Sequence, residues 1–194
     1  MTPSLRQLLT AGRAVLVLTA LLGICYPAVL LAVGGLGLHH QAQGSLLIQD
    51  GSVVGSSLIA QPFDGDEWFQ PRPSAGDHDA LASGGTNAGP SDAELVRTIA
   101  ERRTEIANRD GVAESQVPAD ALTSSASGLD PYISPAYAGV QIDRVAGARH
   151  LPVERVRRLV EDHVQGRSWG FLGQPRVNVV ELNLALQRLS RSER

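Results

Sequence analysis

The sequence has little of what catalytic or disulfide-rich proteins use, with one cysteine, no lysine and five histidines in 194 residues. A single cysteine cannot form a disulfide within the chain, so a folded domain must be stabilised by its hydrophobic core. The absence of lysine indicates coding bias rather than a mechanism. No zinc-ligand spacing is present, and no Gly-x-Ser-x-Gly motif marks a nucleophile. We therefore expect no metal site and no catalytic residue.

Charged residues are also absent from positions 14–38. As a helix this segment would be about 37 Å long, enough to cross a hydrocarbon core of about 30 Å. A cleaved signal peptide has a shorter apolar stretch. A lipoprotein signal would need a small residue directly before its cysteine, but Ile24 precedes Cys25. A buried core helix would not need so long a polar-free run. The segment is predicted to be a transmembrane helix.

The basic residues near this segment are distributed unequally. Arg6 and Arg13 precede it, whereas the next arginine is Arg72, too far away to set topology. The asymmetry predicts a cytoplasmic N-terminus (1–13), a transmembrane helix (14–38) and an extracytoplasmic domain (39–194). The chain is thus expected to be a single-pass protein of the cell (plasma or inner) membrane, surrounded by membrane lipid.

Within the predicted span, Pro27 removes one backbone hydrogen bond, so we expect a kink that frees the Gly23 carbonyl. Ala28 and Ala32, four residues apart, leave a shallow face on which another transmembrane helix could pack. A lone, kinked span is more typical of a subunit's membrane anchor than of a complete transporter.

The predicted external part carries 15 of the 17 arginines and all 20 acidic residues, a net charge of −5. This balance disfavours nucleic-acid binding, which needs a basic patch. Asp50-Gly51 joins two β-rich runs, 45–49 and 52–59, in a predicted hairpin. Residues 64–90, rich in Gly and Pro, show no period and indicate an ordered functional loop or a flexible one.

Helix signals fill the rest of the domain, which gives an α+β fold: a single N-terminal transmembrane helix followed by one extracytoplasmic α+β domain. The predicted helices are one from an N-cap at Ser91 with Glu94 to about residue 108, one from Ser134-Pro135 to about 150, one restarted by Pro152, and one with Asn178 as N-cap and Glu181 at the third position.

Two glycine-containing stretches raise the question of phosphate binding. "SSASGLDPYISPAYA" (124–138) has one glycine and two prolines before its helix, and "SGGTN" (83–87) has no lysine and no helix directly after it. A phosphate-binding loop needs successive free backbone N–H groups that lead into a helix. The residues favour a structural turn over a phosphate loop in both places.

Several motifs, in order along nearly the whole chain, are similar to one family. They are Tyr26-Pro27, "GSSLIAQPF" from Gly55, "RPSA" from Arg72, "ASGGTN" from Ala82, "SASGLDPYISPAYAGVQIDRVAGAR" from Ser125 and "GQPRVNVVELNLAL" from Gly173. The chain thereby resembles the C subunit (KdpC) of the bacterial high-affinity potassium-transporting Kdp P-type ATPase. Thr86, Ala88 and Tyr132 depart slightly from the family pattern.

The resemblance implies a non-catalytic accessory subunit that assembles with a channel-like potassium subunit and an ATP-hydrolysing subunit. It also implies a catalytic chaperone that raises the ATP affinity of the hydrolysing subunit, with Ser125, Ser127, Gly128 and Asp130 as the suggested nucleotide stretch. An extracytoplasmic domain could not touch cytoplasmic ATP. We therefore expect that the chain binds no cofactor itself and that ATP acts on it only through the complex. The alternatives are a regulatory subunit that binds nucleotide directly, and an anchored extracytoplasmic hydrolase.

Overall fold

A computed structural model describes residues 3–192. The predicted terminal segments also include Met1, Thr2, Glu193 and Arg194, which lie outside the described residues. The chain divides into two compact units, one up to Ser45 and one from Leu46 onward. The two units are described separately.

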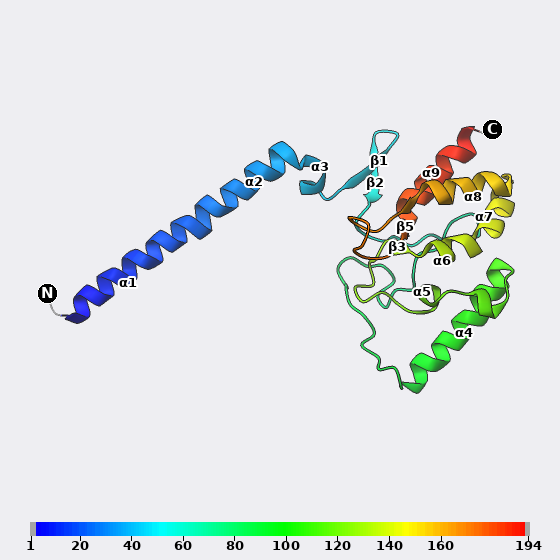
Figure 1. The fold of residues 1–194 in the computed structure, drawn as a ribbon, viewed down its shortest axis with the longest axis horizontal. Helices are drawn as coiled ribbons and strands as arrows, with labels where there is room; N and C mark the ends of the chain where they lie inside the picture. The colour runs from blue at the N-terminus through cyan, green and yellow to red at the C-terminus, as the bar shows by residue number, and fades with distance from the viewer. Residues whose placement is uncertain (1–2, 193–194) are drawn as a thin grey trace. The chain divides into compact units, whose positions relative to one another are not determined.

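The N-terminal unit consists of one long apolar helix and a short helical turn. The long helix comprises α1 (Pro3–Ala20), a π-helical turn η1 (Leu21–Cys25) and α2 (Tyr26–Gly37), and α3 (His39–Ala42) follows (Figure 1). Its mean hydropathy reaches 2.4, and none of the residues in that apolar window is buried. A core helix would be covered by the domain, so these properties agree with the predicted membrane span.

The π turn ends at Cys25, two residues before Pro27. Here the Tyr26 N–H donates to the Leu21 carbonyl, five residues back, so the hydrogen-bond spacing changes where proline lacks its N–H group. Gly23 lies within the turn, and Ala28 and Ala32 are exposed on α2. The kink, the free Gly23 carbonyl and the packing of the two alanines on a partner helix stay predictions.

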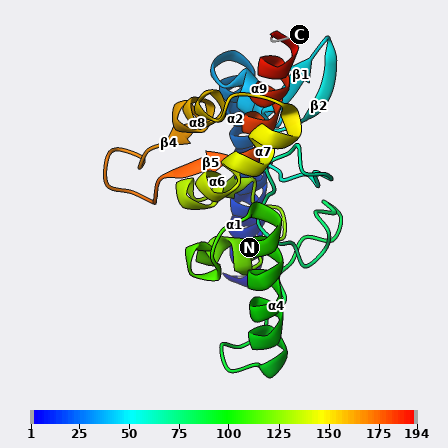
Figure 2. The same ribbon diagram turned by 90° about the vertical axis from the view of Figure 1, so that its right-hand side faces the viewer.

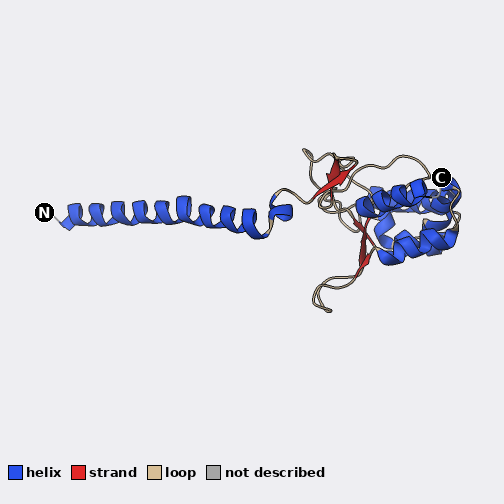
Figure 3. Ribbon diagram, turned by 90° about the horizontal axis from the view of Figure 1, so that it is seen from above, coloured by secondary structure: helices blue, strands red, loops and turns tan. Residues whose placement is uncertain are grey.

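The second unit mixes helices with two small sheets, as the predicted α+β class requires (Figure 3). Its elements are β1 (Leu46–Gln49), β2 (Ser52–Ser56), α4 (Ala93–Asp110), η2 (Glu114–Gln116), α5 (Ala119–Leu122), β3 (Tyr132–Ile133), α6 (Pro135–Val140), α7 (Ile142–Arg149), α8 (Val153–Asp162), β4 (Val164–Gln165), β5 (Arg176–Asn178) and α9 (Val179–Ser192).

The predicted hairpin is confirmed. β1 and β2 pair antiparallel, with a register shift between Leu47 and Ile48. Asp50 and Gly51 both have positive φ values, 52° and 79°, as a two-residue type I′ turn demands. The second strand ends at Ser56 rather than at Ile59.

One core lies among the helices of the second unit. Phe69 from the long loop, Tyr137 from α6 and Leu182 and Leu186 from α9 are its largest buried apolar side chains. The three-stranded sheet, in the order β3-β5-β4 and antiparallel throughout, flanks this core. Segments distant in sequence therefore meet at β5.

Two helix predictions need correction. The N-cap of α4 is Asp92 and not Ser91, because the Asp92 carboxylate accepts hydrogen bonds from the Glu94 and Leu95 N–H groups. The helix that starts at Ser134 does not continue to position 150 but divides into α6 and α7. The division falls at Gln141, whose side chain is fully buried. Ser134 and Asn178 are confirmed as N-caps of α6 and α9.

Candidate functional site

The stretch at 124–134 joins five other segments of the domain. The Ser125 N–H donates to the Pro73 carbonyl, and the Gly128 N–H to the Ser125 carbonyl. The Leu129 N–H donates to the Ser127 hydroxyl. Further contacts reach Ala60, Ser74, Gly84, Asp120 and Val179. The N–H groups of Ser125, Gly128 and Leu129 are thus already occupied within the protein.

The two glycine-containing stretches pair with each other. The Gly84 N–H and the Ser83 hydroxyl both donate to the Ser127 carbonyl, at 2.9 and 3.0 Å. A Cβ on Gly85 would lie 3.0 Å from the Ala126 carbonyl. Gly84 and Gly85 thus allow the two loops to approach each other closely. Sequence alone did not assign this role.

A cleft of about 720 Å³ lies between these loops and the start of α4. Asp92 and Glu94 contribute two carboxylates to its lining, and Arg102 contributes one guanidinium. Arg102 already donates to the Leu122 carbonyl. A triphosphate would meet more negative than positive charge here, so the lining is poorly suited to a nucleotide's phosphates.

Asp130 and Ser134 hold the end of the stretch. The Asp130 carboxylate accepts from the Tyr132 N–H at 3.0 Å and forms an ion pair with Arg72 at 3.4 Å. The Asp120 carboxylate accepts both the N–H and the hydroxyl of Ser134. Ser134 therefore caps α6 from a fixed position. Both Asp130 and Ser134 thus have partners within the domain.

Two buried amide side chains fasten the loop at 64–75. Asn183 accepts the Phe69 N–H at 3.0 Å and donates to the Phe69 carbonyl at 2.9 Å. Gln141 does the same for Gln70, at 2.7 and 3.3 Å. Each amide thus replaces the strand partner that this loop lacks. The sequence allowed either an ordered or a flexible loop at residues 64–90. Residues 64–75 are ordered by these bonds.

A buried ion cluster lies beside Gln141, which together with Asn183 forms what we call the amide clamp. The Asp110 carboxylate contacts Arg144 Nε at 2.6 Å and Arg109 Nη2 at 2.8 Å. Arg144 also donates to the carbonyls of Asp66 and Trp68. The cluster connects α4 and α7 to the long loop. No motif in the sequence predicted this cluster. The one signal was an acidic residue, Asp110, in the last turn of an amphipathic helix, where basic residues are preferred.

Burial raises the pKa of the Tyr137 phenol, against the opposing effect of the Arg109 guanidinium. Below pH about 10, both folded and unfolded tyrosine keep the proton. Above it the unfolded tyrosine ionises first, so unfolding releases a proton and stability falls as pH rises. We expect urea denaturation of Tyr137→Phe to show a shallower loss of stability between pH 9 and 11 than wild type shows. Identical slopes would contradict this.

Gly128 occupies a position that a larger residue should not fit. Its φ is +69°, and an added Cβ would lie 3.0 Å from the Ser74 hydroxyl and 3.1 Å from the Gly84 carbonyl. Gly128→Ala should lower the free energy of unfolding by about 2–3 kcal/mol, from left-handed strain plus the contacts. Gly111 is the matched control, since its φ is +66° with no atom within 4 Å. Gly111→Ala should cost only about 1 kcal/mol, and equal costs in thermal denaturation would exclude the crowding.

Among residues 3–192, no group of three or more His, Cys, Asp and Glu side chains lies close enough together to hold a metal ion. The four residues of the suggested nucleotide stretch do lie together. Ser125 and Gly128 are buried, whereas Ser127 is exposed and Asp130 is partly exposed. Their role toward nucleotide stays a prediction.

Comparison with known proteins is consistent across nearly the whole chain. Residues 8–188 match the family model KdpC, described as K+-transporting ATPase, c chain. A potassium-transporting ATPase KdpC subunit of Kineococcus radiotolerans is 51% identical over 189 residues, 96% of each chain. The subunit of the same name from Xanthomonas oryzae is 49% identical over 89% of this chain and 82% of its own. That of Mycobacterium tuberculosis is 49% identical over 95% and 99%.

Proposed function

The chain belongs to the KdpC family of subunits of the K+-transporting ATPase, and from this membership we propose that its domain is a non-catalytic, extracytoplasmic partner-binding module that does not bind ATP itself. The chain is an accessory subunit of potassium uptake. The proposed partners are the channel-like potassium subunit, against the span and the domain, and the ATP-hydrolysing subunit of the same complex.

The observation that carries this proposal is the use of the 124–134 stretch as a structural junction. Its Ser125 and Gly128 N–H groups bond to carbonyls of the same domain, so a phosphate would have to displace existing hydrogen bonds. The neighbouring cleft presents Asp92 and Glu94, which would repel a triphosphate. Any effect on the ATP affinity of the hydrolysing subunit would then pass through contacts between subunits.

The orientation is supported by Arg6 and Arg13 before the span, with no further arginine until Arg72. Two cysteine variants in a Cys25→Ser background test it. Leu81→Cys lies on the domain surface, where Leu81 is 97% exposed, and Ser4→Cys lies on the other side of the span. In intact spheroplasts, a membrane-impermeant maleimide should label only Leu81→Cys. Lysis should expose Ser4→Cys. The reverse order would overturn the proposal.

The absence of direct ATP binding is tested by thermal denaturation of the full chain in detergent. Adding Mg-ATP should leave the midpoint unchanged, because nothing in the junction would bind it. The matched variant is Ser127→Ala, which removes an exposed hydroxyl of the suggested nucleotide stretch. A midpoint that rises with ATP in wild type but not in Ser127→Ala would favour the rival proposal, a subunit that binds nucleotide directly.

A further inference from the structure

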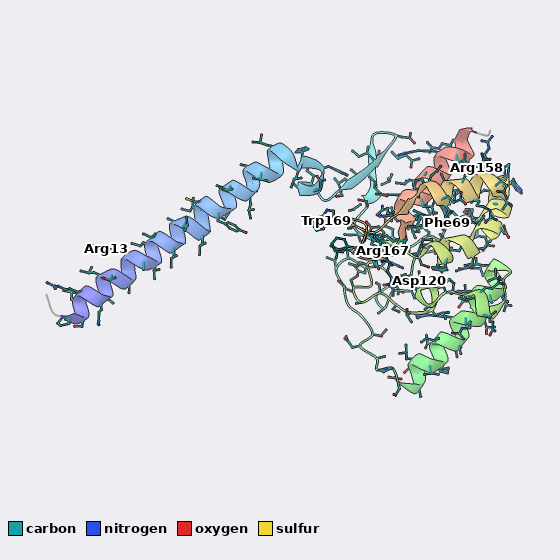
Figure 4. All side chains as sticks on the ribbon, viewed as in Figure 1. Arg13, Phe69, Asp120, Arg158, Arg167 and Trp169 are labelled. Carbon is teal, nitrogen blue, oxygen red and sulfur yellow. The ribbon has the colours of Figure 1, made fainter. Side chains whose placement is uncertain are left out.

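An exposed aromatic tip, defined as Arg167–Leu172, lies between β4 and β5. Trp169 is 85% exposed, Phe171 67% and Leu172 47%. The tip carries one of two tryptophans and one of three phenylalanines in the chain. Figure 2 shows the orange loop that contains it extending away from the helices, and Figure 4 labels Arg167 and Trp169. Large apolar side chains at this exposure are typical of an interaction surface.

The backbone of the tip is defined by its own hydrogen bonds. Ser168 and Leu172 exchange two backbone bonds, at 2.9 and 3.0 Å, around a three-residue turn. Within the turn Trp169 has a φ of +53°, a conformation that a bulky side chain rarely adopts. A strained, closed turn keeps the aromatic rings apart from the core, where burial would otherwise be favourable.

The stretch of sequence that contains the tip differs in charge from the rest of the domain. Residues 163–180 contain Arg167 and Arg176 but no acidic residue, although the chain beyond position 39 has a net charge of −5. Tryptophan beside arginine and aliphatic side chains is the composition found at membrane–water interfaces. A second exposed apolar segment of the domain, the β1–β2 hairpin, has no aromatic or basic side chain and carries Asp50 at its turn.

A lipid surface is also always within reach of this domain. The membrane helix ends at Gly37, and the domain begins at Leu46. The eight residues in between span at most about 30 Å. Tethering at this distance raises the effective concentration of lipid at the domain surface, so even a small apolar patch could bind to the membrane.

We infer that the tip inserts Trp169 and Phe171 into the headgroup region of the membrane that holds the chain, with Arg167 at anionic lipid phosphates. The insertion gives the domain a second attachment to the bilayer, in addition to the helix. The insertion does not depend on which side of the membrane the domain occupies. Maleimide labelling, which tests the orientation, and lipid quenching, which tests the insertion, can therefore fail independently.

The chain suits a fluorescence test because the membrane helix contains no tryptophan. Two full-length variants each keep one tryptophan. Trp68→Phe retains only Trp169 and keeps an aromatic ring against Phe63 and Arg149. Trp169→Asn retains only Trp68, and asparagine tolerates the positive φ of the turn. Both variants are reconstituted into vesicles of equal amounts of phosphatidylcholine and phosphatidylglycerol, with normal or brominated acyl chains.

Brominated lipid should quench Trp169 in the Trp68→Phe chain by about twofold, as for a ring buried about 5–10 Å at the acyl boundary. It should leave Trp68 in the Trp169→Asn chain unchanged. Trp169 should also be protected from acrylamide in vesicles. Two results would overturn the inference: Trp169 open to acrylamide and unquenched by bromine, or shielded from both, which would place the tip against a second copy of the chain.

Discussion

Replacing Asp110 by asparagine should lower the free energy of unfolding by about 3–5 kcal/mol, the largest single-residue effect expected in this domain. The Asp110 side chain is fully buried, and that of Arg144 is only 6% exposed. Asparagine keeps the size but removes the charge, so Arg144 would remain buried without its counter-charge. The loss is measured by urea denaturation of the full chain in detergent.

The control is the same substitution in an exposed ion pair. Asp50 contacts Arg191 at 2.7 Å, but their side chains are 71% and 54% exposed. Water screens this pair, so Asp50→Asn should change the stability by less than about 1 kcal/mol. Asparagine also tolerates the positive φ at that position. If both variants lost the same small amount of unfolding free energy, the buried cluster would not be what connects α4 and α7 to the loop.

The features that could be predicted from sequence are those with a local cause. An apolar run determines the span, Asp50-Gly51 determines a hairpin turn, and Ser134 and Asn178 cap the helices that follow them. Each of these signals lies within one continuous stretch of the chain. The Ser91 prediction was wrong because Asp92, the next residue, is an equally good cap and binds the N–H groups of Glu94 and Leu95.

The missed features depend on contacts between distant residues. β3 and β4 have two residues each and β5 has three, too short for an alternating pattern to show. Gln141 meets Gln70 across 71 residues, and Asn183 meets Phe69 across 114. The local sign of each contact was an amide flanked by apolar residues, Gln141 between α6 and α7 and Asn183 on α9. The paired glycine loops were visible as motifs, but their pairing was not.

This dependence on distant contacts also explains how the junction and the loop act together. Pro73, at the end of the clamped loop, accepts the Ser125 N–H, and Ser74 donates to the Gly128 carbonyl. The amide clamp of Asn183 and Gln141 therefore determines where the loop meets the junction. A defect in the clamp should displace the family's most recognisable motif without altering any of its residues.

Asn183→Leu tests that connection directly. Leucine has a similar size but leaves the buried N–H and carbonyl of Phe69 without partners, and each such group costs about 1–3 kcal/mol. We expect a loss of about 2–5 kcal/mol in unfolding free energy and faster chymotryptic cleavage at Trp68 or Phe69. Phe69 is fully buried in the wild type, so cleavage there requires that the loop separate from α9.

Gln187→Leu provides the control, since Gln187 lies on the same helix and is only half-buried. It should cost less than about 1 kcal/mol and leave the cleavage rate unchanged. Because the junction is part of the proposed partner-binding domain, Asn183→Leu should also reduce co-purification with the other subunits of the ATPase. Wild-type cleavage of Asn183→Leu would show that the loop holds its position without the clamp, and the junction would then depend on its own hydrogen bonds alone.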